Sequence, residues 1–90
     1  MEYKEHDHHE HEDLHHVLLD RYEEELEDAC TYARLAEEHP EEAVGFNSIG
    51  REEVTHAIFL REELEDLGHE FSEEHEKMWH RVLKKYGFER

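Results

Sequence analysis

The chain has 90 residues, which is the length of one small domain. It carries 27 acidic residues against 10 basic ones, and its formal net charge of -17 argues against binding to the phosphate backbone of nucleic acids. The longest apolar run, Ala57-Ile58-Phe59-Leu60, is too short for a membrane helix, and the single cysteine, Cys30, allows neither a disulfide framework nor a thiolate zinc site.

Residues 1–13 alternate histidines with acidic residues and contain almost no apolar side chain. We expect this segment to be a flexible tail, which is either simply solvated or collects metal ions loosely. Residues 14–90 are expected to form one helical domain. The chain starts without the basic and apolar stretches of a secretory signal, so we expect a cytoplasmic location.

An amphipathic helix is predicted over residues 14–38. With about 100° between successive residues, one arc of this helix is apolar and the opposite side is charged. His39-Pro40 ends the pattern, and Pro40 also suits the first turn of a following helix. The residues of the apolar arc are Leu14, Leu18, Tyr22, Leu26, Ala29, Tyr32, Ala33 and Ala36.

Two further helices are predicted over residues 41–67 and 73–86. Gly68 is the expected C-terminal cap of the first, and Ser72 is the expected N-cap of the second, which Gly87 ends. The apolar faces consist of Phe46, Ile49, Ala57, Leu60, Leu64 and Leu67 in the first, and of Met78, Trp79, Val82, Leu83 and Tyr86 in the second.

The predicted fold is all-α, an antiparallel two-helix hairpin with a short third helix. Val54, Ile58 and Phe59 point away from the main seam of this hairpin. Three helices of this size therefore expose more apolar surface than a monomer can cover. We expect a homodimer, or a larger even-numbered homo-oligomer, in which two hairpins complete a four-helix bundle.

Two glutamates and one histidine interrupt the apolar faces of the predicted hairpin. Glu25 lies inside the apolar arc of the first helix, Glu53 lies at the centre of the second apolar face, and His56 follows one turn later. Because the turn is centred near His39, Glu53 falls opposite position 25 or 26, and the three side chains converge. Two carboxylates in an apolar seam repel each other, which a bound cation relieves. Carboxylates with one imidazole suit Fe(II), Mn(II) or Zn(II), and a two-fold dimer would supply four glutamates and two histidines.

Each of these side chains also has a simpler interpretation. An isolated inward glutamate most often reaches water or an arginine, and an isolated histidine at the edge of a core is more often packed than bound to metal. The coincidence of Glu25 and Glu53 at the same depth favours the metal site, because such a pair is unfavourable without a cation. Tyr22, Tyr32 and Trp79 are expected to pack in the core.

These motifs resemble the ferritin-like superfamily, and in particular the encapsulated ferritins. The resemblance covers about Leu18 to Tyr86 and rests on Glu24-Glu25-Leu26-Glu27, on Arg51-Glu52-Glu53-Val54-Thr55-His56 and on a short helix that carries Trp79. It implies a ferritin-like four-helix bundle in which two short chains share a di-iron ferroxidase centre.

The site residues that the resemblance implies are the metal ligands Glu25, Glu53 and His56. It further places Glu24 and Glu27 near the path by which metal reaches the site, and Tyr32 close to the iron. An encapsulin shell is the partner that this family implies. The chain ends at Gly87-Phe88-Glu89-Arg90, without the apolar tail that targets encapsulated ferritins to such a nanocompartment.

Three functions are compatible with these observations. The first is a ferroxidase that oxidises Fe(II) to Fe(III) at a di-iron carboxylate site between two protomers, with Glu25, Glu53 and His56 as catalytic residues and Mn or Zn as other candidate metals. The alternative is a non-catalytic metal-binding or buffering helical protein for Zn, Mn or Ni. The third is a purely structural helical module whose seam carboxylates are solvated.

Overall fold

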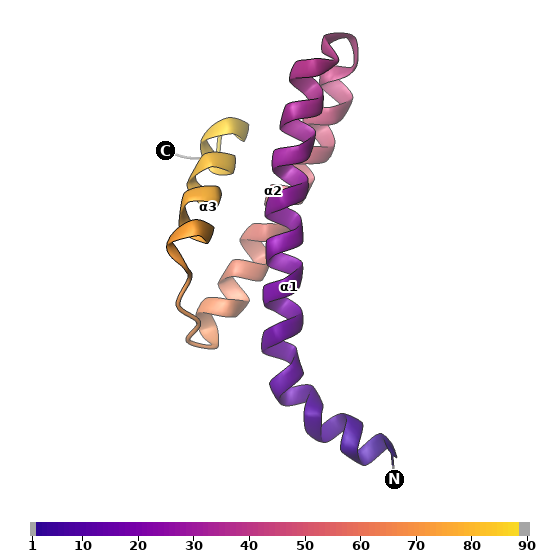
Figure 1. Cartoon of the computed structure of the whole chain (residues 1–90), viewed down its shortest axis with the longest axis vertical. Coiled ribbons are helices and arrows are strands. Elements are labelled where there is room, and N and C mark those ends of the chain that lie inside the picture. Colours follow the sequence, from indigo (N-terminus) through magenta and orange to yellow (C-terminus); the bar gives the residue numbers. More distant parts are fainter. Residues whose placement is uncertain (1, 89–90) are drawn as a thin grey trace.

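The computed structural model describes the backbone of residues 2–88 and the side chains of residues 13–88. Within that range the chain is all-α. Its elements are α1 (Glu2–Glu38), the short 3-10 helix η1 (Pro40–Glu42), α2 (Ala43–Asp66) and α3 (Glu73–Tyr86). α1 and α2 form an antiparallel hairpin, and α3 runs back beside it (Figure 1). The predicted hairpin with a short third helix is confirmed.

The first helix is longer than the predicted one, because α1 begins at Glu2 instead of Leu14. Neither glycine nor proline occurs between Glu2 and Glu38, so nothing in the sequence breaks the helical backbone. Figure 1 shows this first part of α1 extending past the end of the hairpin. The side chains of residues 1–12 lie outside the described part, and the flexibility predicted for residues 1–13 stays a prediction.

The turns and caps follow the predicted signals. Pro40 opens η1, which leads directly into α2. Gly68 and Gly87 follow α2 and α3 with φ angles of 81° and 80°, the left-handed conformation that glycine adopts without strain. The Ser72 hydroxyl accepts a hydrogen bond of 3.1 Å from the His75 amide, which caps α3.

The core lies where α3 closes over one side of the hairpin. The fully buried side chains include Tyr22 and Leu26 from α1, Val54 and Leu64 from α2, and Val82 from α3. The prediction that Val54 points away from the main seam and stays uncovered in the monomer is wrong. Val54 is fully buried, because α3 covers that side of α2. Several residues predicted to share the apolar faces are instead exposed, namely Leu14, Ile49 and Leu67.

Arg61 on α2 ties α3 to the hairpin. Its guanidinium donates a 2.8 Å hydrogen bond to the Tyr22 hydroxyl and forms a 2.8 Å ion pair with Glu76 of α3. The same guanidinium lies over the rings of Phe71 and Trp79, 4.1 and 4.8 Å from their centroids. Burial raises the pKa of Tyr22 to about 12, although the hydrogen bond from Arg61 opposes this rise.

Gly50 is required by a close approach between α2 and the end of α3. It is buried, and a Cβ atom at this position would lie 2.0 Å from the Tyr86 hydroxyl oxygen. That hydroxyl donates a 2.7 Å hydrogen bond to the Ala29 carbonyl of α1. The glycine, which weakens α2 by its helix propensity, thus allows Tyr86 to connect all three helices.

Among the helices that the structure describes, none combines the length and the apolar character needed to span a membrane.

Candidate metal centre

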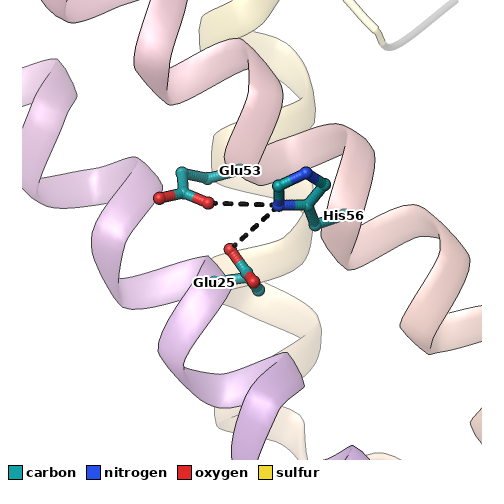
Figure 2. A group of neighbouring side chains, drawn as sticks. All are labelled: Glu25, Glu53 and His56. Atoms are coloured by element: carbon teal, nitrogen blue, oxygen red, sulfur yellow. Dashed lines mark ion pairs between the residues drawn. The ribbon is translucent and has the colours of Figure 1, made fainter.

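The three predicted site residues meet on the hairpin. Glu25 projects from the middle of α1, and Glu53 and His56 project from α2 toward it (Figure 2). The His56 Nδ1 atom lies 3.4 Å from the Glu53 Oε1 atom and 3.6 Å from the Glu25 Oε1 atom. One potential ligand atom from each residue fits within a group whose members are at most 4.8 Å apart. Among the described residues, this is the only such group of three.

Glu25 is almost fully buried, and one of its carboxylate oxygens is unpaired in the described part of the chain, which is unusual for a carboxylate. The residue is 4% exposed, and its Oε1 atom has no hydrogen-bond partner among the described residues. The other oxygen, Oε2, accepts a 2.9 Å hydrogen bond from Arg21, one turn earlier on α1. Leaving a buried carboxylate oxygen unpaired is costly in free energy, so the inward Oε1 atom is suited to a cation that replaces the missing partner.

Glu53 shares this unfavourable environment. The hydrogen bond that Glu53 can donate to Glu25 once it is protonated is the largest cause of a raised pKa. Together with burial and the negative charge of Glu25, it raises the pKa of Glu53 from 4.5 to about 7. A protonated Glu53 can donate its hydrogen to Glu25, which relieves the repulsion between the two carboxyl groups. A divalent cation bound between them would displace that proton and serve the same purpose with more charge.

His56 opens the group to the outside, since its side chain is 57% exposed. Two carboxylates and one imidazole are the ligand types that Fe(II), Mn(II) and Zn(II) accept. One chain supplies three ligands, fewer than the four to six that these ions usually take. Water or a second protein surface can therefore complete the coordination on the His56 side.

The sequence predicts that these three residues meet, because the turn at His39 determines which residues of α1 and α2 lie opposite each other. It did not identify Arg21, whose partnership with Glu25 follows from their spacing of four residues on one helix face. The other residues implied by the resemblance lie apart from the group. Tyr32 packs against Phe46 with 6.1 Å between ring centroids. Glu24 is exposed and pairs with Arg21, and Glu27 is exposed.

Comparison of the chain with protein-family models, with curated proteins and with solved structures finds no match.

Proposed function

We propose that Glu25, Glu53 and His56 bind a divalent metal ion, and that two copies of the chain form a di-iron ferroxidase centre from two such groups. The observation that carries this proposal is the buried, unpartnered Oε1 atom of Glu25, which faces Glu53 and His56 at metal-ligand spacing. The proximity of Glu25 also raises the pKa of the Glu53 carboxyl group to about 7. A cation relieves both conditions at once.

The dimer is supported by what surrounds the group on α2. Ile49 lies seven residues before His56 and Phe59 lies three residues after it, so both share the helix face of the imidazole. Their exposed fractions are 40% and 59%. Exposed apolar residues beside the partly exposed ligand group are suited to a two-fold interface, because a second hairpin would bury them and bring its own ligands. Each iron would then receive ligands from both chains.

The proposed reaction is a balanced two-electron step. Two Fe(II) ions each lose one electron, and dioxygen takes up these two electrons with two protons from water to give hydrogen peroxide. The carboxylates favour Fe(III) over Fe(II), because they offer more negative charge to the more highly charged ion. The net charge of -17 raises the local concentration of Fe(II) and its association rate, more strongly at low ionic strength.

A non-catalytic metal-binding or buffering function is the second candidate. It is favoured by the ion pair between Arg21 and the Oε2 atom of Glu25, at 2.9 Å, which leaves this carboxylate a single free oxygen for metal. A glutamate with one free oxygen cannot form the bridge in which each carboxylate oxygen binds a different ion. A single Zn(II), Mn(II) or Ni(II) ion on one chain would satisfy the same three side chains without redox chemistry.

Anaerobic titration with Fe(II), followed by a pulse of oxygen, separates these functions. The ferroxidase predicts about two irons per dimer and rapid formation of Fe(III), both lost in Glu53→Gln. The matched control is Glu52→Gln, which removes the same charge from an exposed neighbouring position of α2. Binding at one ion per chain without accelerated oxidation would support the buffering function. Oxidation that is equally fast in both variants would contradict the proposed site.

A further inference from the structure

A cleft between α1 and α3 lies outside the proposed metal centre. It measures about 320 Å³, at the lower end of the roughly 300–1,000 Å³ typical of small-molecule sites. Ala33 of α1 and Val82 of α3 are among the apolar residues that line it. Val82 is 1% exposed, so this part of the cleft is continuous with the core.

Most of the charged side chains that line the cleft are basic, in a chain whose net charge is -17. Arg34, Arg81 and Lys85 line the cleft, with Glu37 as the accompanying acid. Lys85 and Glu37 pair with each other at 3.3 Å. In contrast, neither Arg34 nor Arg81 forms a hydrogen bond or an ion pair with any residue of the described part of the chain. Two guanidinium groups are therefore available to a ligand beside an apolar surface.

We propose that this cleft binds a small amphiphilic anion, an organic carboxylate or sulfonate with a short apolar group. The apolar group would lie on Ala33 and Val82, where it gains from leaving water. The anionic group would bind Arg34 and Arg81, because guanidinium forms paired, charge-assisted hydrogen bonds with planar oxyanions. Recognition needs both parts, since the negative field of the whole chain disfavours an anion that has no apolar contact.

Cys30 provides a reporter for this proposal. It is half-buried, lines the same cleft and is the only cysteine of the chain. Burial raises the pKa of its thiol, and Arg81 opposes this rise. A ligand seated in the cleft would cover the thiol and slow its alkylation by a neutral reagent such as iodoacetamide. Because charge changes near the thiol alter its reactivity, the relevant quantity is the ratio of rates with and without ligand in each variant.

The experiment measures this ratio by mass spectrometry on the full metal-free chain, with octanoate, octanol and octylamine as probes. Octanoate should protect the thiol, octanol much less, and octylamine not at all. The double variant Arg34→Glu and Arg81→Glu should weaken octanoate binding by about tenfold or more. The control Lys84→Glu reverses the charge of one exposed cation of α3 that does not line the cleft, and this variant should bind octanoate like the wild type.

Several results would overturn the proposal. Equal protection by octanol and octanoate would show that the cleft does not recognise the anionic group. Equal loss of protection in the Lys84→Glu control would show a general charge effect. Absence of protection in the wild-type chain, whose fold is checked by circular dichroism, would show that the cleft does not bind such anions. None of these results depends on metal binding.

Discussion

Replacing Glu53 by glutamine should stabilise the metal-free protein at alkaline pH, although it removes a charged residue from a helix. Glutamine keeps the shape of protonated glutamate and can donate a hydrogen bond to Glu25. It thereby retains the favourable contact and removes the repulsion. Most substitutions of half-buried residues are destabilising, so a rise in stability here would point specifically to the repulsion between Glu25 and Glu53.

The magnitude follows from the pKa of Glu53, which is raised from 4.5 to about 7 in the folded chain. A carboxyl group with a raised pKa contributes stability that is fully present below pH 4.5 and is lost as the pH rises through about 7. The corresponding free energy is at most about 3.4 kcal/mol. The Glu53 side chain is 19% exposed, and screening by solvent reduces the expected cost to roughly 1–2 kcal/mol at pH 8.

The assay is thermal unfolding of metal-free wild-type, Glu53→Gln and Glu52→Gln chains at pH 5 and pH 8. At pH 8 the Glu53→Gln variant should melt roughly 4–16 °C above the wild type. At pH 5 the difference should largely disappear, because Glu53 is then protonated in the folded protein. The exposed Glu52→Gln control should change little at either pH.

Addition of Mn(II) under the same conditions should reverse the order of stability. A metal that binds only the folded state raises the melting temperature of the wild type, and the Glu53→Gln variant should not respond. A metal-free Glu53→Gln variant that melted below the wild type at pH 8 would show that Glu25 and Glu53 do not repel each other in the folded chain. Equal stabilisation of both chains by Mn(II) would show that Glu53 does not bind the metal.

Three further predictions concern the scaffold. Gly50→Ala should cost about 1–3 kcal/mol in urea denaturation, because its Cβ would lie 2.0 Å from the Tyr86 hydroxyl, whereas Gly45→Ala, with open space around it, should be neutral or stabilising; equal effects would contradict the close approach. Arg61→Met should cost roughly 1–3 kcal/mol in the same assay, and an unchanged urea midpoint would show that the cation does not hold α3. Burial, followed by neighbouring histidines, lowers the pKa of His69, so stability should fall as the pH drops below about 6.5. This fall is best measured in the Glu53→Gln background, where Glu53 no longer makes stability decrease as the pH rises. In that background His69→Gln should flatten the fall between pH 7 and 5.5, and an unaltered slope would contradict the lowered pKa of His69.

Local signals in the sequence were enough to predict the helices and the depth at which they pair. Pro40, Ser72 and Gly87 act within one or two turns of their own positions, so they fix helix ends without knowledge of the rest of the fold. The position of the turn then fixes which residues of α1 and α2 lie opposite each other. The sequence alone therefore places Glu25 and Glu53 opposite each other.

The arrangement of α3 could not be predicted in the same way. It depends on contacts between residues that are distant in the sequence. Examples are the hydrogen bond from the Tyr86 hydroxyl to the Ala29 carbonyl and the close approach of Tyr86 to Gly50. Periodicity therefore predicts an open environment for Val54, and it gives no reason for a glycine at position 50. The start of α1 at Glu2 could not be predicted for another reason, since residues 2–13 contain almost no apolar side chain that would give a periodic pattern, although no glycine or proline there breaks a helix.

The location of bound iron decides whether Glu25, Glu53 and His56 form the metal centre. Crystals grown anaerobically with Fe(II) should show two anomalous difference peaks at the iron absorption edge across a two-fold axis. Each peak should lie within bonding distance of carboxylate oxygens of Glu25 and Glu53 and of the His56 imidazole. Anomalous peaks located elsewhere on the chain, or iron-loaded crystals in which the Glu25 Oε1 atom has no metal neighbour, would contradict the account.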